Sequence, residues 1–181
     1  MRISRVLVCC LIFLTQHYTL KAQARNNDHS FESAIKFVQQ FYDWYAPGAV
    51  QAADRNGEFD LERRASDLDP ILHRALREDK RAQAKAAEIV GIDFDPFLSG
   101  QDPCAPYKAR KVTQRASHYF VDVDADCENV TVKRPTVTAE LVRRNARWIF
   151  VNFHYPDPKP HGSDLLSILR ENRDARQRSS K

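Results

Sequence analysis

The sequence predicts a single α+β domain, in which N-terminal helices pack on a curved antiparallel sheet of about four strands and a short helix follows the sheet. Apolar residues recur every three or four positions in residues 31–45 and again in 68–89, which is the period of helices with one buried face, and residues 49–66 between them are polar. Between residues 109 and 155 the period changes to two, as half-buried strands require. Helices followed by a run of strands are typical of α+β domains rather than of alternating parallel-sheet folds.

Residues 1–24 are predicted to be a cleavable export signal. A positive start with Arg2 and Arg5 precedes an apolar run over Val6 to Thr15, and Ala22-Gln23-Ala24 offers a signal peptidase the small residues it needs. The apolar run is too short for a membrane-spanning helix of roughly twenty residues. An N-terminal core helix is the alternative, but no polar residue interrupts the run to give it a solvent face. We expect cleavage after Ala24 and a periplasmic or secreted protein with no stable membrane anchor.

The charge balance argues against a nucleic-acid partner. The full chain of 181 residues has a net charge of +4, and the 157 residues after the signal have +1 with both signs mixed throughout. Nucleic-acid-binding proteins carry clustered excess positive charge instead.

The cysteines predict one disulfide. Cys9 and Cys10 lie in the signal, and the apolar residues after Cys10 do not fit a lipidation site. Cys104 and Cys127 remain, and an even count in an exported chain favours a disulfide between them. A metal site is the alternative, but the chain has no Cys-x-x-Cys and no His pair at ligand spacing. We expect no metal and no cofactor.

Two helices are expected before the sheet. The first begins at Ser30 as N-cap and ends near Tyr45, where Ala46-Pro47-Gly48 follows. The second begins with Asp69 as N-cap and Pro70, and continues to Ile89. Its expected core face consists of Leu68, Ile71, Leu72, Ala75 and Leu76. Its expected solvated face carries Arg74, Glu78, Arg81 and Lys85.

Strands are expected at 109–114, 118–124, 131–143 and 147–155, with a hairpin turn at Asn145-Ala146. The last of these strands has apolar residues on both faces, which predicts a central strand covered on both sides near its start. A short helix capped by Ser163 or Asp164 follows. The domain is expected to span residues 25–171, with a disordered charged tail at 172–181.

Three segments together resemble a known family: Phe37 to Tyr45 (FVQQFYDWY), the loop Asp93 to Leu98 with Gln101-Asp102, and Trp148 to Tyr155 followed by Asp164-Leu165-Leu166. They are similar to segments of a bacterial domain-of-unknown-function family of small exported or envelope-anchored proteins, some of them lipoproteins. The family is related to the cystatin-like and nuclear-transport-factor-like cone folds. The resemblance implies that fold and the periplasm, and it implies no activity and no catalytic residues.

The first functional hypothesis is a non-catalytic periplasmic binding or accessory domain that contacts another envelope protein, for instance an inhibitor or an immunity protein. Its predicted binding residues are two aromatic residues at the edge of the first helix stripe and four polar residues of the loop before Cys104. They are Phe37, Trp44, Asp93, Asp95, Gln101 and Asp102. Turn formation by Asp next to Pro and Gly is the alternative explanation of the loop residues.

The alternative function is a small cone-fold enzyme or ligand carrier. His118, Asp122 and His154 lie on predicted strands and could meet on one face, where Tyr42 of the first helix would complete an acid–base pocket. A deep closed pocket lined by these residues would favour this function, and a filled apolar cone would argue against it. Asp122, Asp124 and Asp126 also alternate on one face, but the spacing after them does not match a calcium-binding loop.

Overall fold

The computed structural model describes residues 6–54, 61–102, 104–127, 135–159 and 162–179. The chain divides into two compact units, Met1–Ser33 and Ala34–Lys181. Helix α1 (Val6–Ala53) supplies residues to both units, and the second unit contains all the other elements. Within the described residues, no helix combines the length and the apolar character that crossing a bilayer requires.

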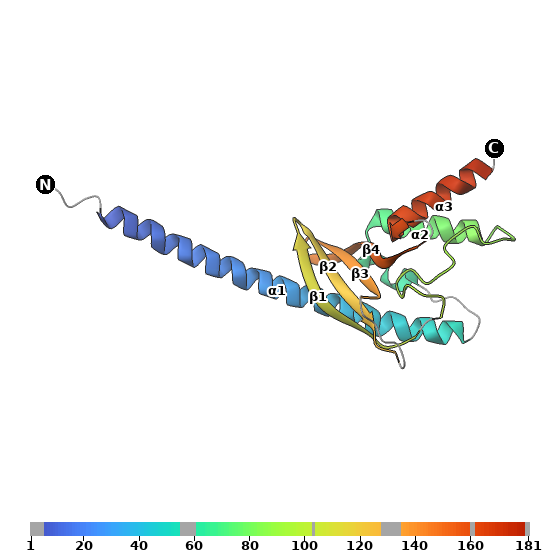
Figure 1. The fold of residues 1–181 in the computed structure, drawn as a ribbon, viewed down its shortest axis with the longest axis horizontal. Coiled ribbons are helices and arrows are strands. Elements are labelled where there is room, and N and C mark those ends of the chain that lie inside the picture. Colours follow the sequence, from blue (N-terminus) through green and yellow to red (C-terminus); the bar gives the residue numbers. More distant parts are fainter. Residues whose placement is uncertain (1–5, 55–60, 103, 128–134, 160–161, 180–181) are drawn as a thin grey trace. The chain divides into compact units, whose positions relative to one another are not determined.

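The second unit is an α+β domain built on an open antiparallel sheet, which confirms the predicted fold class (Figure 1). Its strands follow one another in the order β1-β2-β3-β4-β5. Their bounds are β1 Tyr107–Arg115, β2 His118–Ala125, β3 Val137–Arg144, β4 Arg147–Lys159 and β5 Gly162–Asp164. The fifth strand was not expected, and residues 131–134 of the third expected strand lie outside the described residues.

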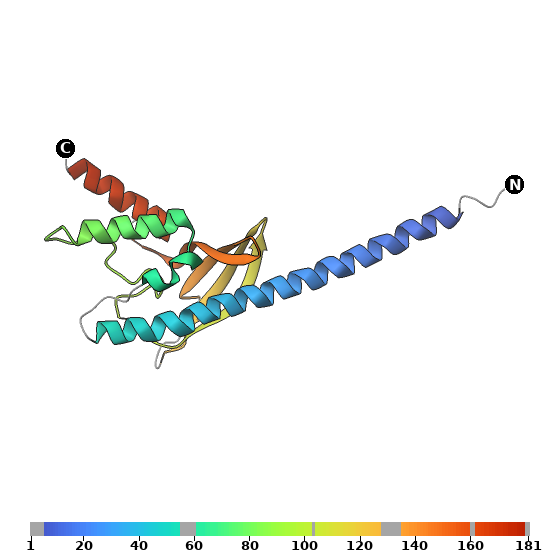
Figure 2. The same cartoon turned by 180° about the vertical axis from the view of Figure 1, so that it is seen from behind.

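One face of the sheet is covered by helices. The part of α1 after Ala34 crosses this face, and α2 (Pro70–Gln83) and α3 (Leu165–Ser179) lie side by side beyond it in both views (Figures 1 and 2). A short 3-10 helix, η1 (Leu61–Asp67), precedes α2. The shared core draws its buried apolar side chains from all three helices and from β1 to β4.

Aromatic rings fill the space between α1 and the sheet. Phe41 of α1 is fully buried, and its ring centre lies 4.8 Å from that of Phe150 on β4 and 5.5 Å from that of Phe97. Phe97 in turn packs edge-on against Phe153 at 4.9 Å. Such pairs add stabilisation beyond the apolar area they bury. The interior of the domain is therefore a packed aromatic core.

A β-bulge explains why β4 has apolar residues of both parities. Leu141 pairs with Phe150 and Glu140 pairs with Asn152, so one residue of β4 is left over between them. Before the bulge Trp148 and Phe150 face the core, and after it Phe153 and Tyr155 do. The shift in alternation at the bulge, rather than cover on both sides of the strand, therefore accounts for the apolar residues of both parities.

The helices differ from the expected bounds at several ends. Ser30 is not an N-cap, because α1 includes it, and α1 continues through Pro47 to Ala53. Ala46 and Ala49 are buried in the core, so tertiary packing outweighs the stop signal at Pro47. The predicted cap at Asp69 is confirmed, since its carboxylate accepts a hydrogen bond from the Ile71 amide at 2.8 Å.

Helices α2 and α3 also differ from their expected bounds at their C-terminal ends. α2 ends at Gln83 rather than at Ile89, and Ile71, expected in its core face, is 60% exposed. α3 begins after Asp164, which accepts a hydrogen bond from the Ser167 amide at 3.1 Å as an N-cap does. Residues 172–179, expected to be a disordered tail, form the last turns of α3.

The β3–β4 hairpin turns where expected, at Asn145-Ala146, and both residues have positive φ angles of 49° and 62°. Two-residue hairpin turns of this type favour Asn followed by Gly, because Ala in the left-handed region carries a steric penalty of about 1 kcal/mol.

We therefore expect Ala146→Gly to raise the free energy of unfolding by about 0.5 kcal/mol, after the larger entropy of Gly in the unfolded chain is deducted. Urea denaturation followed by circular dichroism measures it. Ala109→Gly, inside β1, is the matched control and should lower the same quantity. An Ala146→Gly protein less stable than the wild type would contradict the strain at this turn.

Candidate functional site

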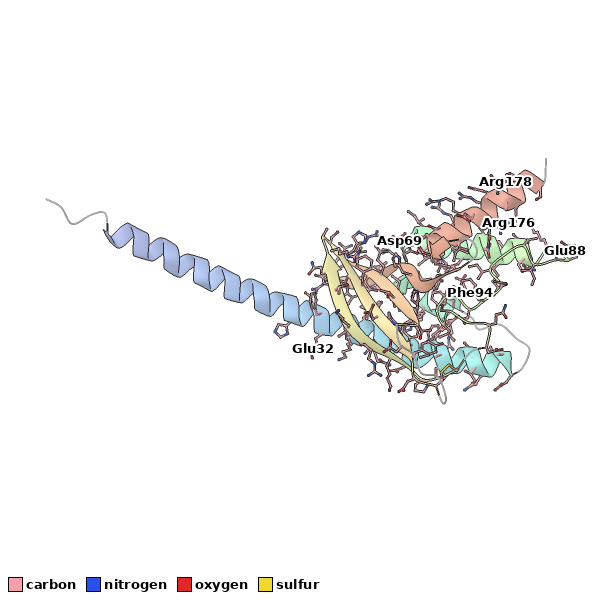
Figure 3. The ribbon with its side chains drawn as sticks, viewed as in Figure 1. Glu32, Asp69, Glu88, Phe94, Arg176 and Arg178 are labelled. Atoms are coloured by element: carbon pink, nitrogen blue, oxygen red, sulfur yellow. A yellow bond between two sulfur atoms is a disulfide. The ribbon has the colours of Figure 1, made fainter. Side chains whose placement is uncertain are left out.

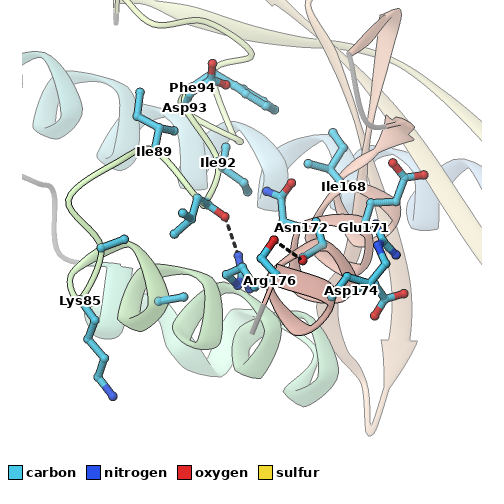
Figure 4. A pocket seen from close by; sticks show the side chains of 17 residues that line it. Lys85, Ile89, Ile92, Asp93, Phe94, Ile168, Glu171, Asn172, Asp174 and Arg176 are labelled. Carbon is cyan, nitrogen blue, oxygen red and sulfur yellow. Dashed lines mark hydrogen bonds between the residues drawn. The ribbon is translucent and has the colours of Figure 1, made fainter. Parts of the chain in front are cut away.

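An open cleft of about 1020 Å³ lies between α3 and the segment that follows α2 (Figure 4). Ile92, Phe94 and Ile168 give it apolar walls, and Ile89 at its edge is 72% exposed, the most exposed large apolar side chain described. Charged side chains of both signs surround them. These are Lys85, Asp93, Glu171, Asp174, Arg176 and Arg178.

An ion pair between α2 and α3 holds the cleft together. Arg176, labelled on α3 in Figure 3, donates a hydrogen bond to the Asp79 carboxylate at 2.7 Å. It donates another to the Val90 carbonyl at 2.8 Å, which Figure 4 draws as a dashed line. The side chains of Asp79 and Arg176 are only 7% and 20% exposed. The second oxygen of Asp79 accepts a hydrogen bond from the Ile92 amide at 2.8 Å. Asp79 and Arg176 thus connect both helices to the segment between residues 90 and 92.

Gln83 completes this polar clamp on the segment after α2. Its amide oxygen accepts hydrogen bonds from the backbone N–H groups of Val90 (2.9 Å) and Gly91 (3.1 Å), and its amide nitrogen donates to the Glu88 carbonyl (3.1 Å). A Cβ atom at Gly91 would lie 2.7 Å from an oxygen of Asp79, so only glycine allows this close approach. The side chain of Gln83 therefore turns the chain back at the point where α2 ends.

Breaking the clamp should destabilise the protein strongly. We expect Arg176→Ala to lower the free energy of unfolding by about 3 kcal/mol, because it leaves the buried Asp79 carboxylate without its cation. Chemical denaturation measures the change.

Arg173→Ala on the same helix is the control. Arg173 pairs with Asp174 at 3.5 Å, and both side chains are about half exposed, so its loss should cost less than about 1 kcal/mol. Equal effects of the two substitutions would contradict the special role of Arg176.

The predicted recognition loop divides into an outward and an inward part. Asp93, Gln101 and Asp102 are exposed, and Asp93 lines the cleft. Asp95 instead faces inward, where one carboxylate oxygen accepts hydrogen bonds from the Phe97 (2.9 Å) and Leu98 (3.0 Å) amides. Turn formation, the alternative explanation, therefore accounts for Asp95.

Tyrosine hydroxyl groups pin the same loop to the core. Three consecutive residues of the loop accept hydrogen bonds at their carbonyl groups, from Tyr42 (2.8 Å), Tyr107 (3.0 Å) and Tyr155 (2.9 Å). Their acceptors are the carbonyl groups of Phe97, Leu98 and Pro96. Tyr45 donates to the other oxygen of Asp95 at 2.9 Å. Burial raises the pKa of Tyr107 to about 12, with the nearby Asp95 carboxylate as a second cause.

Burial raises the pKa of Asp95 above its ordinary value, although its three hydrogen bonds oppose the shift. A raised pKa in the folded state means that ionisation of Asp95 opposes folding. Its contribution to stability is therefore largest below the ordinary carboxyl pKa and is lost as the pH rises through the folded-state value.

We therefore expect the free energy of unfolding of the wild type, relative to that of Asp95→Asn, to fall as the pH rises from 3.5 toward neutrality. The reason is that the raised pKa of Asp95 makes its ionisation unfavourable in the folded state. The amide keeps an oxygen for the Phe97 and Leu98 N–H groups but does not titrate. Urea denaturation of both proteins at a series of pH values gives the difference. A difference that grows in favour of the wild type with rising pH would contradict the raised pKa.

The two predicted aromatic binding residues of α1 pack against the domain. Phe37 is half-buried, with its ring centre 4.9 Å from that of Phe150. Trp44 is half-buried too, and the guanidinium carbon of Arg64 lies 5.3 Å from the centre of its ring. Both residues lie at the edge of the apolar stripe, as the helical spacing predicts, and neither lines the cleft.

The predicted acid–base residues do not form one pocket. His118 on β2 and His154 on β4 do share the face away from the helices, because Glu140 of the intervening β3 joins them. The carboxylate of Glu140 lies 2.6 Å from Nδ1 of His118 and 2.7 Å from Nε2 of His154. Tyr42 is buried among the aromatic rings on the opposite face. The structure therefore brings the two histidines together and places Tyr42 apart from them.

Asp122 shares the open face with the two histidines, and its carboxylate accepts a hydrogen bond from Thr138 at 3.0 Å. None of these residues lines the cleft. The sequence analysis did not identify Glu140. It lies two residues after Thr138 on the predicted strand 131–143, so the strand alternation places both side chains on the same face.

The predicted disulfide is confirmed. Cys104 and Cys127 are joined across 23 residues, with a Cα–Cα distance of 6.1 Å. The bond connects the end of the pinned loop to the end of β2, and it fits an oxidising compartment. In the described part of the chain, no group of three or more His, Cys, Asp or Glu side chains is arranged to hold a metal ion.

Comparison with known proteins gives no relative. No protein-family model, no curated protein and no solved structure matches the chain.

Proposed function

We propose that this protein is a non-catalytic binding domain that recognises another protein through the cleft between α3 and the segment after α2. The observation that carries the proposal is the exposed Ile89 at the edge of an open, apolar-walled cleft. Ile89 adjoins Ile92, Phe94 and Ile168 in the lining of the cleft, and contiguous apolar surface with a polar rim is typical of interaction sites. An apolar side chain of the partner would fit between Ile89, Phe94 and Ile168.

The rim of the cleft supports a protein partner. Lys85 and Arg178 are basic and Asp93 and Glu171 are acidic, so the rim offers partners for both signs of charge around an apolar centre. This arrangement is typical of protein interfaces, where a polar rim surrounds apolar anchors. The clamp of Asp79 and Arg176 would hold the cleft in its binding shape before the partner arrives, which lowers the entropy cost of association.

The interior of the domain supports a surface function as well. The space between α1 and the sheet is filled by aromatic side chains, and Tyr42 is separated from His118 and His154. The enzyme or carrier alternative expected a deep, closed pocket lined by His118, Asp122 and His154. We accordingly favour binding at the surface over chemistry within the fold.

The place of action that we propose is the periplasm or the exterior of the cell, after removal of residues 1–24. The disulfide between Cys104 and Cys127 supports this location, since such bonds persist in oxidising compartments. The resemblance to exported cone-fold proteins points the same way and makes an envelope protein the expected partner. An inhibitor or an immunity protein is a specific form of this function.

The test is affinity capture from periplasmic extract with the purified protein lacking residues 1–24. We expect Ile89→Arg to abolish capture of the partner, because it places a charge where an apolar contact is needed. Ile71→Arg is the matched control, since Ile71 is the other exposed isoleucine among the described residues and does not line the cleft. Capture that Ile89→Arg leaves intact, or that both substitutions reduce equally, would contradict the proposal.

A further inference from the structure

The positive charge of the chain is concentrated on α2 and α3. The two helices together hold eight Arg or Lys residues and four Asp or Glu residues, a net charge of +4. This equals the net charge of all 181 residues, so the rest of the chain is neutral in sum. The folded domain therefore carries its excess positive charge on these two helices.

A second, shallower groove of about 460 Å³ runs between the two helices. It is lined by Glu78, Arg81, Ala82, Lys85, Arg173, Arg176 and Gln177. Four of these side chains are cationic and one is acidic. The groove adjoins the cleft, with which it shares Ala82, Lys85 and Arg176, and its other lining residues are its own.

Three of the four cations are available to a ligand. Arg176 is engaged by Asp79 inside the domain. Within the described residues, the exposed side chains of Arg81 and Lys85 have no ion-pair partner. The ion pair described for Arg173 joins it to Asp174 at 3.5 Å, with both groups about half exposed, and such a pair contributes little energy. An incoming anion can therefore pair with these cations at little expense to the fold.

We propose that this groove binds an acidic segment of a partner protein. Arg74, Arg77 and Arg81 recur every three or four residues along one side of α2, and Lys85 follows two residues after the helix ends. The three arginines span about 10 Å, the length of roughly two helical turns. Acidic side chains with the same spacing on a partner helix would face these cations one by one. Arginine guanidinium groups pair with carboxylates through two parallel hydrogen bonds.

The same observations disfavour nucleic acids and anionic membranes. Glu78 lies inside the groove, and α3 carries Glu171 and Asp174 within two residues of Arg173 in sequence. The positive field is therefore short and interrupted. Polyphosphate backbones and lipid surfaces are bound by broader fields of excess positive charge. A short acidic segment needs only the few cations present. The proposal adds a second contact surface and does not depend on the cleft.

The experiment uses the protein without residues 1–24 and a fluorescent peptide of repeated Glu-Glu-Ala-Ala units, about four helical turns long. Fluorescence anisotropy gives its dissociation constant. We expect saturable binding that weakens with added salt and about a tenfold or greater loss with Arg81→Glu/Arg173→Glu. Arg81→Gln/Arg173→Gln should give a smaller loss in the same direction, and it serves if the charge reversal impairs folding.

The matched control is Lys36→Glu/Lys111→Glu, which reverses two exposed cations outside α2 and α3 and should leave affinity within about twofold. Ile89→Arg should also leave it unchanged, so a failure here is distinguishable from a failure of the cleft. Three results would overturn the proposal. They are absence of saturable binding at about 0.1 M salt, an equal loss in the control, and tighter binding of duplex DNA or phosphatidylglycerol vesicles than of the peptide.

Discussion

The ion pair of Asp79 and Arg176 is the constraint on which the proposed binding surfaces depend. A carboxylate that is 7% exposed is stable only if a cation and further donors satisfy it. Arg176 supplies the cation from a helix that is 97 residues away in sequence, and the Ile92 amide supplies a donor. Meeting this requirement places α3 beside α2 and fixes one wall of the cleft. The same contact sets the spacing of the cationic groove.

The interior of the domain is filled, and its polar groups are hydrogen-bonded within the described residues. Aromatic rings occupy the space between α1 and the sheet, and the tyrosine hydroxyl groups are used to hold the loop that contains Asp95. Among the described residues, no buried side-chain nitrogen or oxygen lacks a hydrogen-bond partner. Such a satisfied interior stabilises one structure, and its polar groups are already engaged. The apolar cleft and the cationic groove are then the surfaces that offer unsatisfied contacts to another molecule.

Local patterns predicted much of the fold but little of the site. The cap at Asp69, the hairpin turn at Asn145 and the change from helical to strand period depend on neighbouring residues, so the sequence contains them. The continuation of α1 through Pro47 depends on burial against distant strands. The pairing of Asp79 with Arg176 also joins distant segments, and each residue alone looks like part of a solvated helix. Long-range contacts of this kind have no periodic signal.

Amide hydrogen exchange of residues 90–92 tests the central claim most directly. The N–H groups of Val90, Gly91 and Ile92 are bonded to side chains of α2, not to a helix or a sheet. A clamped cleft predicts that they exchange slowly in the wild type, and that Arg176→Ala accelerates their exchange well beyond its effect on the amides of β3. Exchange at these positions as fast as in an unfolded peptide would show that the segment opens freely. That result would contradict a cleft that is formed before its partner binds.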